Sequence, residues 1–258
     1  MMLKHYHEPM ADPTVHGSRI AFFGGSFDPP HRGHLAVARA ARAALQLDSV
    51  LFAPVGEQPL KPHGSSAGFA DRVAMTRLAI AGEPGFVVSL ADAPTAAGHP
   101  NYTFDTLERL REEMPGEGTL FCLMGADSFL GLRQWHRGAQ IPFIAPLIVA
   151  SRPGQQLLDL ADVLPAGLSI EPEDAPPDES RPGHPSAAKL RPDELRCLTL
   201  RNAAGDTASF YLLPDLHVDI SASEIRAQAS AAHGRLPAGH ELLPDAVAEY
   251  IAAHGLYR

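Results

Sequence analysis

Short, continuously apolar segments alternate with helix-forming segments along most of this 258-residue chain. Two of the apolar runs, Ser18–Phe23 and Thr119–Met124, stop directly at a glycine, which is typical of a strand that ends in a turn. Strands that alternate with helices of about 10–15 residues indicate βαβ units, and continuous apolarity indicates parallel strands covered on both faces. The sequence therefore predicts an α/β fold with a five- or six-stranded, mostly parallel sheet and helices on both faces.

Residue preferences set the expected limits of these elements. Ala, Leu and Arg are strong helix formers, whereas Gly and Pro mark the ends of helices and strands. The expected strands are Ser18–Phe23, Ser49–Pro54, 86–90, Thr119–Met124, Pro146–Ser151 and Ser209–Leu213. The expected helices are His34–Leu47, Ala70–Ala81, Thr103–Met114, one that starts at Ser221, and a last one with Pro244 in its first turn and Gly255 just past its end.

Two segments do not follow this pattern. Residues 1–17 are polar and show no periodicity, so we expect a loose leader before a single domain over residues 18–258. Residues 153–192 contain eight prolines and several acidic residues. Proline lacks an amide donor and interrupts both helices and strands. We therefore expect a Pro-rich, partly disordered insertion at about 153–208.

Composition excludes several classes of protein. The formal net charge of −9 argues against a broad surface for nucleic acid or for anionic membranes, because such surfaces need clustered cations. The two cysteines exclude a disulfide framework and a four-cysteine zinc site. No apolar run approaches the roughly 20 residues of a membrane span, and residues 1–17 lack the apolar core of a signal peptide. We expect a cytoplasmic protein.

The segment GGSFDPPHRGH, Gly24–His34, follows the first expected strand and leads into the first helix. Ligands of open α/β sheets bind at this carboxyl edge, and a helix N-terminus attracts anions. His31 and His34 share one helical face, and Gly33 leaves room between them for a phosphate. Imidazole donors can stabilise charge that develops on a leaving group. The motif therefore indicates a phosphate site rather than a simple turn.

The segment ISASEIR, Ile220–Arg226, is the second motif. Ser221 and Glu224 have the spacing of a capping box, which predicts that a helix starts there whatever the function is. Ser223 and Arg226 lie in the first turns of that helix, where a hydroxyl, free amides and a guanidinium can converge on one anion.

Both motifs resemble the signature motifs of the HxGH nucleotidyltransferase superfamily, and the closer resemblance is to the bacterial nicotinate-nucleotide adenylyltransferase family. Further stretches resemble that family in the same order: PLKPH, ADRVAMTRLAI, NYTFDTL, MGADSFLGLRQW, LIVASRPG and YIAAHGLYR. The resemblance covers most of residues 19–152 and 209–258. Two positions depart from the family pattern. Leu60 stands where a histidine is frequent, and Ser223 stands where threonine is usual.

The resemblance implies a Rossmann-like nucleotidyltransferase fold and a set of site residues. It implies that His31, His34 and Arg226 are catalytic, that Asp127 accepts a ribose hydroxyl and that Trp135 stacks on the pyridine ring. From the residues alone, Asp127 is equally well a helix N-cap and Trp135 a core residue. The positions implied for ATP are Gly24, Gly25, Ser26, Phe27, His31, His34, Gly125, Asp127, Ile220, Ser221, Ser223 and Arg226. Those implied for the acceptor are Lys61, Tyr102, Thr103, Trp135 and Arg152, and no residue is assigned to a protein-held metal.

The implied reaction joins nicotinate mononucleotide to the adenylyl group of ATP and releases pyrophosphate, within NAD biosynthesis. Mg²⁺ is expected to be carried with ATP, since it usually relies on substrate phosphates and water. Thr103 as an N-cap would leave amides near residues 104–106 to bind the nicotinate carboxylate. Three alternatives stay open: an adenylyltransferase for nicotinamide mononucleotide or phosphopantetheine, a metallohydrolase with His31 and His34 as ligands, and a nucleotide sensor without turnover. The sequence also leaves a homo-oligomer open.

Overall fold

The computed structural model describes residues 19–60, 64–96, 98–114, 116–150, 163–171, 195–213, 216, 220–233 and 239–258. The strands are β1 (Arg19–Gly25), β2 (Ser49–Pro54), β3 (Phe86–Val88), β4 (Thr119–Gly125), β5 (Leu147–Ala150), β6 (Leu168–Ile170), β7 (Arg196–Asn202) and β8 (Thr207–Leu213). The helices are α1 (Arg32–Leu45), α2 (Phe69–Ala79), α3 (Thr103–Glu113), α4 (Ala126–Leu130), α5 (Ile141–Ile144), α7 (Ala222–Ala231) and α8 (Asp245–His254), with 3₁₀ turns at Leu132–Gln134 and Gly138–Gln140.

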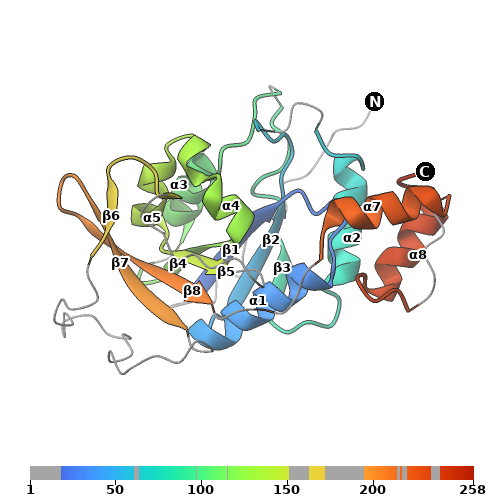
Figure 1. Ribbon diagram of the computed structural model, residues 1–258, viewed down its shortest axis with the longest axis horizontal. Helices are drawn as coiled ribbons and strands as arrows, with labels where there is room; N and C mark the ends of the chain where they lie inside the picture. The colour runs from blue at the N-terminus through green and yellow to red at the C-terminus, as the bar shows by residue number, and fades with distance from the viewer. Residues whose placement is uncertain are drawn as a thin grey trace.

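The strands form one sheet in the order β3-β2-β1-β4-β5-β8-β7-β6 (Figure 1). The first six of these pair in parallel, which confirms the predicted parallel sheet. The predicted number of five or six strands is wrong, because β6 and β7 extend the sheet to eight strands by antiparallel pairing beyond β8. In β7 half-buried residues alternate with buried ones, unlike the continuous apolar runs of the parallel strands.

The predicted insertion contains both extra strands. Its described parts, residues 163–171 and 195–208, carry β6, β7 and the start of β8. The other parts of the insertion, residues 153–162 and 172–194, and the predicted leader lie outside the described residues.

Helices cover both faces of the sheet, as predicted. Odd-numbered residues of β1 and β4, such as Ala21 and Phe121, pack in a core under α1, and the even-numbered ones, such as Phe22 and Cys122, pack in a second core under α3, α4 and α5. This alternation follows from the period of two along a strand. Figure 1 shows α1 on one side of the sheet and α3, α4 and α5 on the other.

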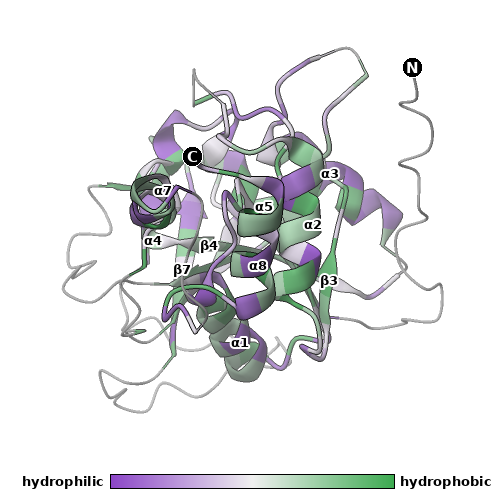
Figure 2. Ribbon diagram, turned by 90° about the vertical axis from the view of Figure 1, so that its right-hand side faces the viewer, coloured by the Kyte–Doolittle hydropathy of each residue, from purple (hydrophilic) through white to green (hydrophobic). Residues whose placement is uncertain are grey.

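A third apolar cluster joins α2, α7 and α8 at the end of the sheet near β3. Its buried members include Met75 of α2, Ile225 of α7 and Ile251 of α8. Figure 2, which looks from this end, shows α2 and α8 next to each other. The C-terminal helix α8 therefore packs against α2 and α7.

The sheet order positions a ligand site. After β3 the chain crosses the sheet and continues with β4 on the other side of β1. Open α/β sheets bind ligands at the carboxyl ends of the strands at such a point of reversal. The carboxyl ends of β1 and β4, Gly25 and Gly125, lie on this edge. Among the described residues, no helix has the length and apolarity that a membrane span requires.

Candidate active site

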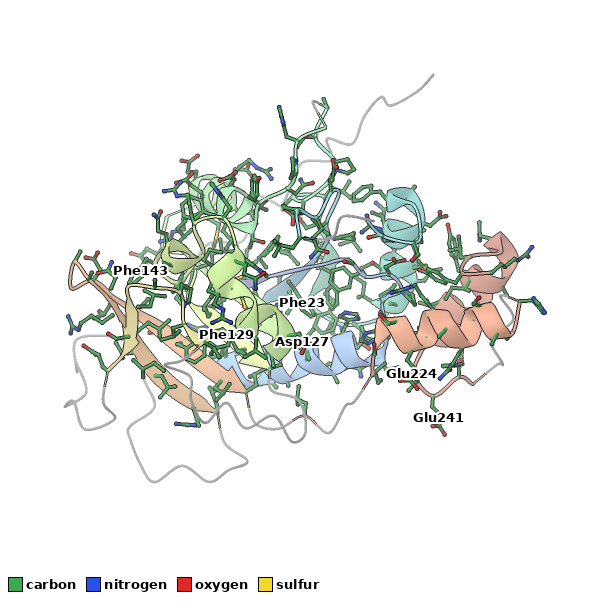
Figure 3. The ribbon with its side chains drawn as sticks, turned by 45° about the horizontal axis from the view of Figure 1, so that its top comes forward. Phe23, Asp127, Phe129, Phe143, Glu224 and Glu241 are labelled. Atoms are coloured by element: carbon green, nitrogen blue, oxygen red, sulfur yellow. The ribbon has the colours of Figure 1, made fainter. Side chains whose placement is uncertain are left out.

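A cavity of about 610 Å³ lies at the carboxyl ends of β1 and β4. Its volume falls within the range of about 300–1,000 Å³ that is typical of small-molecule sites. Figure 3 labels two of its lining residues, Phe23 of β1 and Asp127 of α4. The cavity brings together every sequence-predicted site residue that the structure describes, namely Gly24, Gly25, Ser26, Phe27, His31, His34, Tyr102, Thr103, Gly125, Asp127, Trp135, Ile220, Ser221, Ser223 and Arg226. Lys61 and Arg152 lie outside the described residues.

The two histidines form a fixed pair at the start of α1. His31 is the N-cap of the helix and is 7% exposed. Its backbone N–H donates a hydrogen bond to Nδ1 of His34 across 3.2 Å, and the two ring centroids lie 3.7 Å apart. The ring of Phe27 packs on His34 at 4.9 Å between centroids. These contacts hold both imidazoles on the cavity wall at the N-terminus of α1, the positive end of the helix dipole.

The second motif meets the first through Arg226. One guanidinium nitrogen of Arg226 donates to the backbone carbonyl of Asp28 at 2.7 Å, and another donates to Oγ of Ser223 at 3.1 Å. Residues 198 positions apart in the chain thus meet at the cavity wall. A guanidinium, two imidazoles and two helix N-termini line one space, which is an arrangement suited to a polyphosphate.

Ser221 is the N-cap of α7, so the predicted helix start is confirmed. The predicted capping box is wrong, because no side-chain capping bond forms at Ser221. The carboxylate of Glu224 instead accepts a hydrogen bond from Gln228, one turn further along the helix. Both side chains of the expected box therefore leave the first-turn amides available to a ligand.

Asp28 and Arg72 support the loop between β1 and α1, and sequence reasoning assigned neither of them a role. The carboxylate of Asp28 accepts hydrogen bonds from the amides of Ser66 and Ala67 and from the hydroxyl of Tyr257. The guanidinium of Arg72, 2% exposed, donates to the carbonyl of Ser26 at 2.7 Å. Burial lowers the pKa of Arg72, which the nearby Asp28 partly offsets.

The same guanidinium also donates to the carbonyls of Val55 and Ala67. Arg72 therefore ties the ends of β1 and β2 to the start of α2. Arginine is rarely fully buried in folded proteins, so nothing in the sequence signals the burial of Arg72, whereas Asp28 stands inside the first motif.

The other end of the cavity is aromatic. Tyr102 and Trp135 both line it, and the ring of His136 packs on that of Tyr102 at 4.5 Å between centroids. The predicted N-cap of α3 is wrong by one residue: the N-cap is Tyr102, and Thr103 is the first helical residue. The amides without helical partners therefore begin at Thr103 instead of at residue 104. The helix N-terminus still faces a space lined by aromatic rings.

Asp92 and Asp127 both line the cavity. Asp127 is in the first turn of α4, whose N-cap is Gly125, so Asp127 is not itself the cap. Asp92, 3% exposed, holds Oγ1 of Thr106 with one carboxyl oxygen and was not predicted. Burial raises the pKa of Asp92 to about 6, while the Thr106 bond and the nearby Arg109 oppose that rise. Asp92 lies in a loop with no recognisable pattern, so only the fold reveals it.

Nothing in the described part of the chain completes a metal centre around the two histidines. Across those residues, no group of three or more His, Cys, Asp or Glu side chains is arranged to hold a metal ion. The hydrolase alternative requires such a group. The geometry therefore gives that alternative no support.

Comparison with known proteins agrees with the fold and the motifs. The family model described as cytidylyltransferase-like matches residues 22–228. A protein of Gloeobacter violaceus named "Probable nicotinate-nucleotide adenylyltransferase" is 38% identical over 93% of this chain and 97% of its own length. A protein of Laribacter hongkongensis with the same name is 40% identical over 93% of this chain and 94% of its own length.

The solved structure of Plasmodium falciparum nicotinic acid mononucleotide adenylyltransferase complexed with NaAD has a TM-score of 0.63 to this chain, with 16% identity over 93% of this chain and 97% of its own. At that identity the likeness concerns the fold, and it supports the predicted Rossmann-like nucleotidyltransferase architecture. The sequence relatives support a closer relationship, because they match 93% of this chain at more than a third identity. The chain therefore belongs to the nicotinate-nucleotide adenylyltransferase family of cytidylyltransferase-like nucleotidyltransferases.

Proposed function

We propose that this protein transfers the adenylyl group of ATP to nicotinate mononucleotide, forming nicotinate adenine dinucleotide and pyrophosphate. The lining of one cavity is the main support for this proposal. A single cavity joins the His31–His34 pair and Arg226 at one end to Tyr102, Trp135 and the N-terminus of α3 at the other. The first end suits a polyphosphate, and the second suits a flat ring that carries an anion.

The chemistry needs no covalent intermediate. A phosphate oxygen of the mononucleotide attacks the α-phosphorus of ATP, the new P–O bond forms in line with the bond that breaks, and pyrophosphate leaves with the bonding electrons. The attacking oxygen is already anionic, so no general base is required. Catalysis then consists of positioning two substrates and stabilising the negative charge that gathers on the leaving phosphates.

The described side chains can supply that stabilisation. His34 accepts at Nδ1 from the backbone of His31, so its neutral ring carries the proton on Nε2 and presents a donor. Arg226 keeps a planar, permanently charged fork whose two bonds to Asp28 and Ser223 fix its orientation. In the proposal both side chains bind the β- and γ-phosphates, whose charge increases as the bond to the α-phosphate breaks.

Mg²⁺ belongs to the proposal as an ion carried by the triphosphate. The described residues lack a cluster of protein ligands that would hold a metal by themselves. Mg²⁺ does not need such a cluster, because it takes most of its ligands from substrate phosphate oxygens and water. Bound there, Mg²⁺ would supply further charge neutralisation.

The acceptor is proposed to lie between Trp135 and the start of α3. First-turn amides and the positive end of the helix dipole favour a carboxylate over a neutral amide group. The same cavity would fit nicotinamide mononucleotide sterically, and only the charge of the ring substituent separates the two substrates. Lys61 and Arg152, which lie outside the described residues, remain proposed binding residues for nicotinate mononucleotide.

A pyrophosphate-release assay tests the function. Purified protein is incubated with ATP and Mg²⁺ and one acceptor from a panel of nicotinate mononucleotide, nicotinamide mononucleotide and phosphopantetheine. Fast release with the first and slow release with the others supports the proposal. Fast release with phosphopantetheine would instead indicate an adenylyltransferase for that acceptor. ATP binding without pyrophosphate release would indicate a nucleotide sensor.

A further inference from the structure

The C-terminal turn of the chain contacts the first motif. Tyr257, the penultimate residue, donates its hydroxyl to Oδ1 of Asp28 at 2.7 Å, although the two residues are 229 positions apart. Tyr257 adopts a left-handed backbone conformation with φ of 59° just after α8. Leu256 and Tyr257 pack against the apolar cluster of α2, α7 and α8. Figure 2 shows the C-terminus beside these helices.

Asp28 is held from four directions. The amides of Ser66 and Ala67 donate to its two carboxyl oxygens at 2.6 and 3.1 Å, and Tyr257 adds the third donor. The guanidinium of Arg226 holds its backbone carbonyl. Asp28 is 4% exposed, so bulk water has little access to replace a missing donor. The tyrosine hydroxyl is the one side-chain donor among the described residues that bind this carboxylate.

The charges around Asp28 make that hydroxyl important. Two guanidinium groups, those of Arg72 and Arg226, interact electrostatically with the Asp28–Tyr257 pair. Arg72 is committed to four backbone carbonyls and cannot turn to the carboxylate without breaking those bonds. Arg226 is only partly buried, and it already touches the carbonyl of the same residue.

Tyr257 is a constant donor in this arrangement. Burial, the hydrogen bond to Asp28 and the negative charge of Asp28 all raise the pKa of the Tyr257 hydroxyl far above its ordinary value. The hydroxyl therefore keeps its proton well above the pH at which a tyrosine ordinarily ionises. The Tyr257–Asp28 hydrogen bond is therefore a fixed structural contact and not a pH switch.

We propose that Tyr257 is a positioning residue of the active site, which satisfies the carboxylate of Asp28 and so leaves the guanidinium of Arg226 directed at the triphosphate. This inference rests on the proposed function, since it assigns Arg226 to ATP. Without the hydroxyl, the buried carboxylate lacks one donor, and Arg226, which already contacts the Asp28 carbonyl, is a cation that can move to it. An Arg226 that pairs with Asp28 is no longer available to phosphate.

The test compares Tyr257→Phe with Tyr250→Phe. Tyr250 is a matched control because it lies on α8, is half-buried, and donates its hydroxyl to another aspartate, Asp71, at 2.9 Å. Tyr250 does not line the cavity. Each variant loses one oxygen and one bond to a carboxylate, and Tyr257→Phe should lower the melting temperature more, because Asp28 is buried whereas Asp71 is half-buried. Affinity for a non-hydrolysable ATP analogue is measured by calorimetry, and KM is measured for both substrates.

We expect Tyr257→Phe to weaken analogue binding and raise the KM for ATP by about 5–10-fold, a part of the 10-fold or more that a hydrogen bond to a charged group is worth. The KM for the acceptor should stay within about twofold, as should all constants of Tyr250→Phe, because distant sites behave independently. Equal effects of the two variants, an unchanged affinity in Tyr257→Phe, or a Tyr257→Phe chain that does not fold would each overturn the proposal.

A double-mutant cycle separates positioning from general packing. In an Arg226→Ala background the substitution Tyr257→Phe should change analogue affinity by less than about twofold, since the group through which it acts is gone. An additive effect would show that Tyr257 does not act through Arg226. If the unmodified protein binds no ATP analogue at all, the proposed function itself fails, which is a different result from equal binding by both proteins.

Discussion

The backbone N–H of His31 donates to Nδ1 of His34 across 3.2 Å, and this bond fixes which nitrogen of His34 can serve a ligand. A neutral imidazole that accepts at Nδ1 carries its proton on Nε2. The donor on Nε2 is then preorganised on the cavity wall, with the ring held by Phe27 on one side. Preorganised donors stabilise developing charge without a cost of reorganisation during the reaction.

The first prediction is that His34→Ala lowers kcat by about 10²–10³-fold, which is the loss reported for single preorganised oxyanion donors. The folded state should persist, because His34 is only partly buried. Steady-state rates and a melting curve measure both effects. His240→Ala is a suitable control, since His240 also accepts a backbone amide at Nδ1 over 3.2 Å but lies outside the cavity lining. Turnover near that of the unmodified protein in folded His34→Ala would refute the role.

The second prediction concerns Arg226→Lys. Lysine keeps the positive charge but cannot bridge the Asp28 carbonyl, Ser223 and a phosphate with one planar group. The KM for ATP should rise by about tenfold or more, in line with the loss of one hydrogen bond between charged groups. Titration with ATP at saturating acceptor measures it. A lysine variant with undiminished ATP affinity would reduce Arg226 to a surface cation.

The third prediction is a pH dependence of stability centred on Asp92. Because burial raises the pKa of this carboxyl from 3.8 to about 6, the folded state holds the proton more tightly than the unfolded state. Its favourable contribution is complete below pH 3.8 and is lost as the pH rises through 6. Asp92→Asn removes the charge and keeps an oxygen for Thr106, so it should stabilise the protein at pH 8 by up to about 3 kcal/mol.

The advantage of Asp92→Asn should disappear near pH 4, where the natural carboxyl is protonated. Thermal melts of both proteins at pH 4 and pH 8 measure the difference. Glu241→Gln, which changes an exposed carboxyl (Figure 3), should give a stability difference of similar size at both pH values. A variant that is less stable at pH 8 than at pH 4, relative to the unmodified protein, would contradict the assigned pKa.

The fourth prediction concerns Thr103→Ala at the acceptor end. The proposed donors to the nicotinate carboxylate are backbone amides, which this substitution retains, and Thr103 is the first helical residue and not the cap. The preference for nicotinate over nicotinamide mononucleotide should therefore fall only partly. Complete loss of the preference in Thr103→Ala would mean that the threonine hydroxyl, and not the helix N-terminus, distinguishes the substrates.

The parallel part of the fold was predictable because its signal is local. Strands buried on both faces read as continuous apolar runs, and the expected limits of Ser49–Pro54 agree with β2 residue for residue. The antiparallel strands β6 and β7 escaped prediction for the opposite reason. β6 has three residues, and β7 alternates between half-buried and buried positions within a Pro-rich stretch.

The site residues also fall into two groups, those with a local sequence signal and those without one. His31, His34 and Arg226 stand in contiguous motifs, and their gathering in one cavity follows from the position of those motifs at the carboxyl edge of the sheet. Arg72 and Asp92 carry no local signal, because their burial depends on loops that meet only in the folded chain. The capping box at Ser221 failed because sequence spacing permits that bond without requiring it.

The preference between the acid and the amide substrate is the sharpest test of the proposed acceptor. The measurement is kcat/KM for nicotinate and nicotinamide mononucleotides at one fixed concentration of ATP. A bond to a charged carboxylate is worth about 1.5–3 kcal/mol, and about 1.4 kcal/mol corresponds to tenfold. We expect a preference of at least about 10–100-fold for the nicotinate substrate. Equal values, or a preference for nicotinamide mononucleotide, would contradict the proposed acceptor while leaving adenylyl transfer in place.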